Sequence, residues 1–143
     1  MAHSYQEQID RMWNLIKLNN QAKRKKFWLE SISLSYILLE AELRLVLFAK
    51  GFSTDTIDNQ PYLMNLANLA KDNGIITSDL WDKLHDFNTK RRQAIHGLVK
   101  GEIQYDDLEE PAIQFSELAG EIQGQWLTID IGDEETLSEH INE

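Results

Sequence analysis

Residues 21–50, QAKRKKFWLESISLSYILLEAELRLVLFAK, are the stretch that indicates the fold most directly. Its apolar side chains recur at the spacing of an α-helix, and Gly51 follows where a glycine commonly ends one. One apolar stripe comprises Trp28, Ile32, Tyr36, Leu39, Leu43 and Val46; the other comprises Leu34, Ile37, Leu38, Ala41, Leu45 and Phe48. A helix that is apolar over so wide an arc is buried on more than one side. The segment therefore predicts the central helix of a bundle, or a helix that also serves a subunit interface.

Helical patterns continue on both sides of this segment. Ser4 and Glu7 have the spacing of a capping box, which predicts a first helix as far as about Leu18, interrupted by Asn19-Asn20. After a loop at residues 52–61, three further helices are expected. Their predicted bounds are about 61–73, from Thr77 or Ser78 to Ile95 or His96 before Gly97, and about 108–131 with Ile113, Phe115, Leu118, Ile122, Trp126 and Ile129 facing inward.

These patterns predict an all-α fold with about four to five helices in one bundle. The chain has only two prolines and seven glycines, and it contains neither an internal repeat nor an alternation of strands and helices. Its 143 residues suit a single domain, which we expect at residues 1–131. Residues 132–143 are expected to form an acidic, frayed tail.

Composition excludes several classes of protein. The chain has no cysteine, which excludes a disulfide scaffold, a zinc finger and a thiol nucleophile and agrees with a reducing compartment. Its N-terminus lacks the pattern of a signal peptide, and no apolar stretch is long enough to span a membrane. We therefore expect a cytoplasmic protein that makes no membrane contact.

Charge is segregated along the chain. The net charge of −10 excludes a generic basic coat for nucleic acid. Residues 1–100 nevertheless hold all 14 Lys and Arg with 11 acids, whereas residues 101–143 hold 13 acids and no Lys or Arg. The acidic last third either aids solubility and pairs with the basic body, or it covers a site for a polyanion there. Both interpretations stay open.

A charged residue interrupts the apolar stripe of the helix that begins near Ser78. At about 100° per residue, Arg91 falls in the middle of a stripe made by Leu80, Leu84, Phe87, Ala94 and Leu98. A guanidinium cannot lose its charge, and burying it without a partner is costly. Arg91 therefore has a buried partner, or the stripe faces a cleft or another subunit.

His96 lies five residues after Arg91, which in an intact helix places it about 140° away around the axis. Arg92 and His96 instead share a face, with His85 near it. A histidine at this position can interact with the C-terminal end of the helix dipole or act as a cap. It can also transfer protons, because histidine exchanges them readily near neutral pH.

The segment Arg91-Arg92-Gln93-Ala94-Ile95-His96-Gly97 resembles the R-x4-H motif of HEPN (higher eukaryotes and prokaryotes nucleotide-binding) domains. The apolar helix at residues 36–44 is similar to the one that precedes the motif in that family. The resemblance covers most of residues 20–131, and about seven residues of it are specific. One position departs from the pattern, because the family often has Asn, Asp or His where this chain has Arg92.

The resemblance implies a helical bundle that forms a homodimer. Many such domains are metal-independent ribonucleases of toxin or defence systems, often paired with a nucleotidyltransferase-like antitoxin, and others have kept the fold without the chemistry. In the active members, the arginine and histidine of both subunits meet across the dimer. Cleavage of RNA needs a base, an acid and cations around the phosphorane, and two copies of one histidine can supply the two proton-transfer groups.

We therefore predict Arg91 and His96 as catalytic residues, with Arg92, Lys90 and Lys100 as contacts to an RNA substrate. The expected products carry 2′,3′-cyclic phosphate ends, and we expect neither a cofactor nor a metal. The rival hypothesis is a non-catalytic HEPN-like module that binds a nucleotide or a protein within a larger complex.

Other patterns carry weaker predictions. Residues 23–26, KRKK, form either a solvated helix start or a contact to an RNA backbone. Asp82 and His85 have a spacing that occurs in metal sites, and Glu117 and Glu121 share a helix face, but neither pair has a matching second motif.

Overall fold

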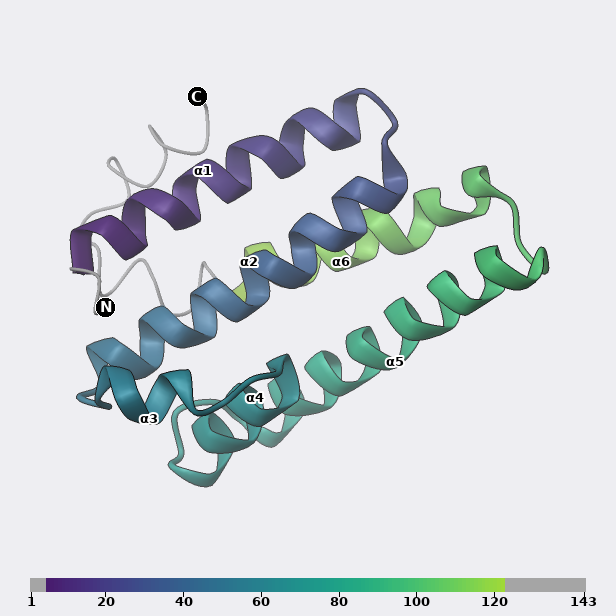
Figure 1. The fold of residues 1–143 in the computed structure, drawn as a ribbon. Helices are drawn as coiled ribbons and strands as arrows, with labels where there is room; N and C mark the ends of the chain where they lie inside the picture. Colours follow the sequence, from purple (N-terminus) through teal and green to yellow (C-terminus); the bar gives the residue numbers. More distant parts are fainter. Residues whose placement is uncertain (1–4, 123–143) are drawn as a thin grey trace.

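A computed structural model describes residues 5–122, and within this range all regular structure is helical (Figure 1). The elements are α1 (Tyr5–Arg24), α2 (Trp28–Ala49), α3 (Thr54–Asp58), α4 (Leu63–Asp72), α5 (Ser78–Lys100), the 3₁₀ turn η1 (Tyr105–Leu108) and α6 (Glu109–Ile122). The predicted all-α bundle is therefore confirmed. The acidic segment at residues 132–143 lies outside the described residues.

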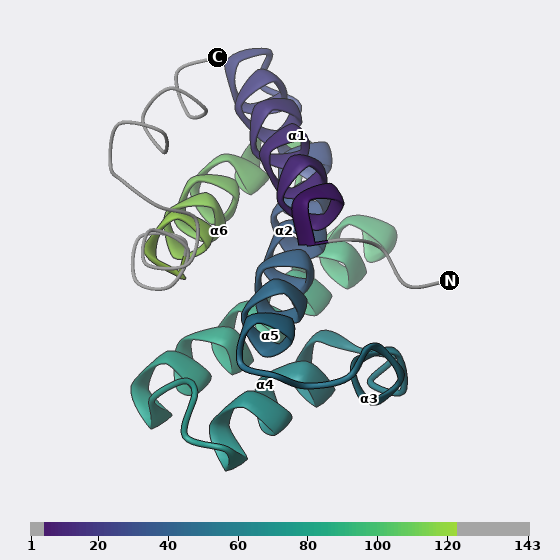
Figure 2. The same cartoon turned by 90° about the vertical axis from the view of Figure 1, so that its left-hand side faces the viewer.

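Helix α2 is the centre of the bundle. It packs against α1, α6 and α4, and the two ribbon views show α1 on one side of it and the α4–α5 pair on the other (Figures 1 and 2). Leu39, Leu43 and Val46 of the first stripe and Leu45 of the second are at most 1% exposed. Burial on more than one side, predicted from the two stripes, is thus confirmed for most of α2. Ile37 is the exception, since it remains exposed.

The break between the first two helices was predicted at the wrong place. Helix α1 continues through Asn19 to Arg24, and the chain reverses at residues 25–27, where Lys26 adopts a positive φ of 60°. The buried side chain of Asn19 is retained inside the fold because Ser31 donates to its Oδ1 (2.6 Å) and its Nδ2 donates to Ser35 (3.0 Å). Asn19, which the sequence pattern predicted as a helix break, therefore links α1 to α2 through hydrogen bonds. Ser4 of the proposed capping box lies outside the described residues.

The C-terminal end of α2 follows the prediction, whereas the next segment does not. Gly51 has φ 97°, and the amide of Phe52 donates to the carbonyl of Leu47, as in a Schellman ending. The loop predicted at residues 52–61 contains helix α3, whose first turn is capped when Ser53 Oγ accepts from the amide of Thr56 at 3.1 Å.

The end of α5 was also predicted wrongly. Thr77 caps its start as expected, by accepting from the amide of Leu80 at 3.1 Å, but the helix passes through Gly97 and ends at Lys100. Gly101, with φ 74°, is the residue that terminates it. A Cβ at Gly97 would stand 3.1 Å from Ile103 Cγ1, so this glycine permits close packing of the returning chain instead of ending the helix.

Helix α6 closes the core. Phe115, Leu118 and Ile122 are buried as predicted, together with Ala112 and Ala119. Ile113 is 43% exposed, so its place on the inward face was predicted wrongly. Trp126 and Ile129 lie outside the described residues. Within residues 5–122, no helix is both long and apolar enough to cross a bilayer.

Candidate functional site: a cleft between α4 and α5

Aromatic packing fixes α5 one turn before Arg91. Leu80, Leu84 and Phe87 are buried, which confirms the first half of the predicted stripe. The Phe87 ring lies edge-on to Phe115 of α6, with a centroid distance of 4.3 Å, and is stacked with Tyr36 of α2 at 6.3 Å. Such packing restrains both rings. The next turn of α5 therefore places Arg91 beside Tyr36.

Arg91 is partly buried and has no acidic partner among the described residues. Its Cζ lies 4.0 Å from the centre of the Tyr36 ring, a cation–π contact. Its Nε is buried and makes no hydrogen bond. Within residues 5–122, Arg91 therefore has no buried acidic partner and lines a cleft, which is one of the alternatives that the sequence left open.

The guanidinium lines a cavity of about 600 Å³ between α4 and α5. From α5 the cavity is lined by Trp81, His85, Asn88, Thr89, Arg91 and Arg92; from α4 and the residue before it, by Tyr62, Leu63, Met64, Asn65 and Asn68; and from α2, by Tyr36. Among the described residues, this lining contains two arginines and a histidine but no Asp or Glu. Within residues 5–122 of a chain with an excess of acids, the charged side chains that line this cavity are thus cationic.

Tyr36 forms the wall behind Arg91. Its hydroxyl lies 3.5 Å from the amide of Leu63, which is the first residue of α4. Burial raises the pKa of Tyr36 above its ordinary value of 10.0; the contact with the Leu63 amide and the charge of Arg91 act in the opposite direction, and Glu40 adds to the increase. The phenol therefore stays neutral near pH 7 and presents its ring to the cation.

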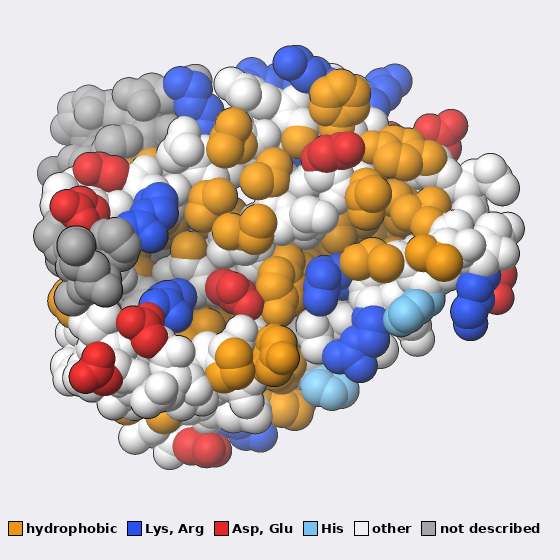
Figure 3. Space-filling model, in the orientation of Figure 1, with side chains coloured by type: hydrophobic (Ala, Val, Ile, Leu, Met, Phe, Trp, Pro, Cys, Tyr) orange, Lys and Arg blue, Asp and Glu red, His pale blue; other side chains and the backbone are white. Residues whose placement is uncertain are grey.

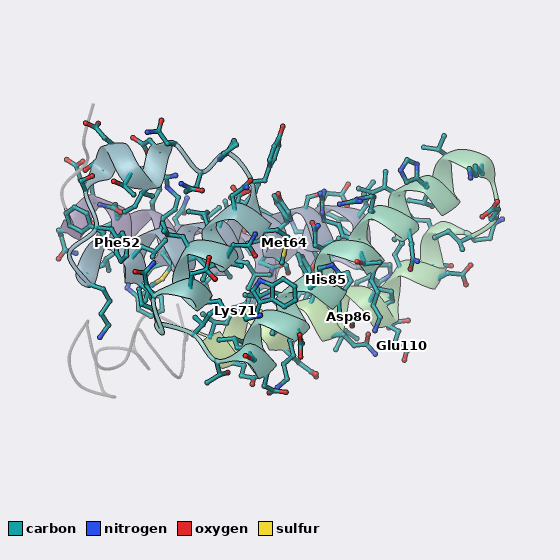
Figure 4. All side chains as sticks on the ribbon, turned by 90° about the horizontal axis from the view of Figure 1, so that it is seen from below. Phe52, Met64, Lys71, His85, Asp86 and Glu110 are labelled. Atoms are coloured by element: carbon teal, nitrogen blue, oxygen red, sulfur yellow. The ribbon has the colours of Figure 1, made fainter. Side chains whose placement is uncertain are left out.

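The other end of the cleft holds a second aromatic group. Trp81 Nε1 donates to Asn68 Oδ1 at 2.8 Å, and the indole ring is stacked with His85 at a centroid distance of 5.2 Å. Lys71 Nζ lies 4.4 Å from the centre of the same ring. Met64 and Lys71 on α4 and His85 on α5 are seen together in Figure 4. These contacts join α4 to α5 and hold the indole and imidazole in fixed positions.

The structure does not bring His96 to this cleft. His96 is exposed on α5, one turn beyond Arg92, which does line the cleft. Lys90 pairs with Asp86 at 3.0 Å and lines a different depression between α5 and α6. Lys100 is exposed in the last turn of α5. Of the five predicted site residues, Arg91 and Arg92 meet in the cleft of one chain, and the other three do not.

His96 belongs to a separate face of α5. Arg92, Ile95, His96 and Val99 have the i, i+3, i+4, i+7 spacing of one helix face. Val99 is 80% exposed, the highest value among the large apolar residues described, and Ile95 is only partly buried. Figure 3 shows histidine, lysine and arginine side chains along α5, next to a band of hydrophobic side chains. This face is open to a second molecule.

The weaker sequence patterns have structural explanations. Among the described residues, no group of three or more His, Cys, Asp or Glu could hold a metal ion, and Glu121 pairs with Lys83 at 2.9 Å. Within the basic run, Lys23 is partly buried and donates to Ser116 of α6 at 2.6 Å. Burial lowers the pKa of Lys23, and the nearby charge of Glu117 opposes that decrease.

Sequence reasoning missed the Trp81 end of the cleft. Trp81, His85, Asn88 and Arg92 recur at helical spacing, which places two aromatic rings, an amide and a guanidinium on one helix face. This pattern could have predicted a binding surface there. The opposing Asn65 and Asn68 could not be found in this way, since only the tertiary packing brings α4 to that face. No protein-family model, curated protein or solved structure matches this chain.

Proposed function

We propose that this chain is a metal-independent endoribonuclease domain that acts as a homodimer, in which Arg91 binds the scissile phosphate and His96 transfers protons. The observation that carries the proposal is the state of Arg91: a guanidinium held against Tyr36, without an acidic partner among the described residues, in a cleft whose lining has no Asp or Glu. A charge kept in this way is suited to an anionic ligand.

A phosphodiester is the anion that fits this arrangement best. Guanidinium groups recognise phosphate through parallel hydrogen bonds from a planar fork, and Arg92 brings a second guanidinium to the same cleft. The cavity is also large enough for more than an isolated ion, because ligand pockets of about 300–1,000 Å³ accommodate small organic molecules. These features support a ligand that combines a phosphate with a larger organic group.

Catalysis requires a proton-transfer group that the cleft of one chain does not receive from His96. In the proposed homodimer, the α5 faces carrying His96 and Val99 pack against each other, which covers an exposed apolar side chain and brings two imidazoles together. The similarity of residues 91–97 to the R-x4-H motif supports this arrangement. Arg92, on the boundary between the cleft and this face, would link the phosphate to the dimer contact.

The reaction follows from these groups. One His96 removes the proton of the ribose 2′-hydroxyl, whose oxygen attacks the adjacent phosphorus. The His96 of the second copy donates a proton to the departing 5′-oxygen, and Arg91 stabilises the negative charge on the phosphorane. The products are a 2′,3′-cyclic phosphate and a 5′-hydroxyl, and the two histidines exchange their protonation states.

The test is incubation of the purified protein with mixed single-stranded RNA in the presence of EDTA. We expect cleavage to cyclic phosphate ends, and a loss of about 10²–10⁴-fold in His96→Ala, the usual effect of removing a general acid or base. Arg11→Ala, an arginine substitution on α1, is the matched control. Because the mechanism uses both copies of His96, mixing wild-type with His96→Ala chains should lower activity through heterodimers that carry a single imidazole. Intact RNA, or cleavage that persists in His96→Ala, would refute the proposal.

The second candidate is a non-catalytic module that binds a nucleotide or protein, for example an antitoxin partner. The position of His96 outside the cleft favours it. This candidate predicts Arg91-dependent binding to intact RNA or to a partner protein, with no effect of His96→Ala.

A further inference from the structure

The cleft has two chemically different ends. Helices α4 and α5 run in opposite directions, so the Trp81 end lies beside Asn68 and Lys71, and the Arg91 end lies beside Leu63 and Tyr36. Ten residues separate Trp81 from Arg91, which is about 15 Å along the helix axis. One end is cationic, whereas the other is aromatic and amide-rich.

From this division we infer that the Trp81 end is a subsite for one unpaired base of single-stranded RNA, adjacent to the phosphate site at Arg91. The inference rests on the proposed function in assigning a phosphodiester to Arg91. A base and its phosphate are separated by a ribose, so a nucleotide needs subsites displaced along the cleft, and His85 at the Trp81 end lies six residues before Arg91, about 9 Å along the helix axis.

His85 would provide the stacking surface. Its imidazole is exposed, lines the cleft and is stacked with the Trp81 indole at an interplanar angle of 18°. The indole is itself held by its hydrogen bond to Asn68 and by the ammonium of Lys71. A base would extend this stack without reorganising it, and stacking on aromatic side chains is how proteins commonly hold single-stranded nucleic acid.

Asparagines line the cleft beside this stack. Asn65 and Asn88 make no side-chain hydrogen bond to any other described residue. Asn68 accepts a hydrogen bond from Trp81 at its Oδ1, and its Nδ2 makes none within the described residues. Amides offer both a donor and an acceptor, the combination that recognises the edge of a base. A duplex would not satisfy this subsite, because its base edges are paired and its bases are stacked on one another.

The experiment measures binding to the full-length His96→Ala protein, so that cleavage does not interfere. The probes are a fluorescent single-stranded RNA hexamer of mixed sequence, the same hexamer in a duplex, and an abasic ribose-phosphate chain of equal length. We expect the hexamer to bind most tightly. Adding His85→Ala should weaken the hexamer by about 5- to 150-fold, the contribution of stacking one base, and leave the abasic chain unchanged.

Two further variants separate stacking from folding. His85→Phe should restore hexamer binding, because it keeps an aromatic ring at the position. Asp82→Ala, an exposed residue on the same helix outside the cleft, should have no effect. Equal binding of hexamer and abasic chain, or tighter binding of the duplex, would overturn the base subsite.

The result is distinguishable from a failure of the proposed function. If the hexamer is preferred through His85 but wild-type protein leaves RNA intact, the nuclease proposal fails and the subsite holds. If RNA is cleaved but the abasic chain binds equally well, the nuclease proposal holds and the subsite fails.

Discussion

The core around α2 and the cleft between α4 and α5 each contain an ionisable side chain with a buried polar atom. Neither buried atom makes a hydrogen bond to the described residues. In the core, Glu42 is fully buried, and neither carboxyl oxygen has a hydrogen-bond partner in the part of the chain that the structure describes. Burial raises its pKa well above the ordinary value of 4.5, so the carboxyl can become neutral by taking up a proton. Arg91 cannot become neutral, and it lies where the fold opens. The core therefore removes a charge, whereas the cleft preserves one.

The largest expected effect is on the charge in the cleft. Arg91→Ala should lower RNA cleavage by about 10²–10³-fold, as removal of one group that stabilises transition-state charge typically does. The free energy of unfolding should fall by only about 0.5–1 kcal/mol, the value of an accessible cation–π contact. Arg91→Lys should rescue stability more than activity, because an ammonium lacks the planar fork. Unchanged cleavage with a large loss of stability would make Arg91 a structural residue.

The second prediction concerns polar groups that the core satisfies. Asn19→Ala leaves Ser31 and Ser35 without their hydrogen bonds to Asn19, which should lower the free energy of unfolding by about 1–3 kcal/mol. Urea denaturation followed by circular dichroism measures this change. Asn14→Ala, at an exposed position on the same helix, is the control and should be close to neutral. Equal effects of the two substitutions would contradict the role of Asn19 as a tie between α1 and α2.

The third prediction concerns Glu42, the polar group that the core leaves unsatisfied. In the folded chain its pKa is raised, whereas the unfolded chain ionises near 4.5, so folding binds a proton. Its contribution to stability is therefore fully present below pH 4.5 and is lost as the pH rises toward the raised pKa. Glu42→Met should abolish this dependence and stabilise the fold at pH 7, because a thioether carries no charge that burial removes from water.

Denaturant unfolding of wild type and Glu42→Met between pH 4 and pH 8 measures this difference, with the exposed Glu102→Gln as control. Parallel pH profiles for wild type and Glu42→Met would contradict a raised pKa of Glu42 in the folded chain.

The smallest expected effect compares two neighbouring cations on α5. Arg92 lines the cleft, whereas Lys90 is paired with Asp86 outside it. Arg92→Ala should therefore reduce the slope of log affinity for single-stranded RNA against log salt by about 0.7, the value for one phosphate contact. Lys90→Ala should leave the slope nearly unchanged. Equal reductions would place the RNA backbone across both sides of α5.

Local patterns predicted much of the helical framework. The wide apolar arc of α2, the glycine after it, the Thr77 cap and the buried stripe of Leu80, Leu84 and Phe87 are all properties of short segments. They were predictable because each depends on residues within one or two turns. The break at Asn19-Asn20 and the stop at Gly97 were wrong for a common reason. Both residues are local helix breakers whose actual role is set by Ser31, Ser35 and Ile103, partners elsewhere in the chain.

By itself, then, the sequence determined that this chain is helical, that α2 is buried on more than one side, and that the charged Arg91 occupies an apolar stripe. Tertiary structure decided that Arg91 lines a cleft. Only the packing of α4 beside α5 forms the cleft, whose lining in residues 5–122 has no acid, and sets Asn68 against Trp81, while the packing of α2 places Tyr36 beside the guanidinium. Helical periodicity fixes which side chains share a face, because it depends on backbone geometry alone. What each face meets depends on long-range packing, which no local pattern encodes.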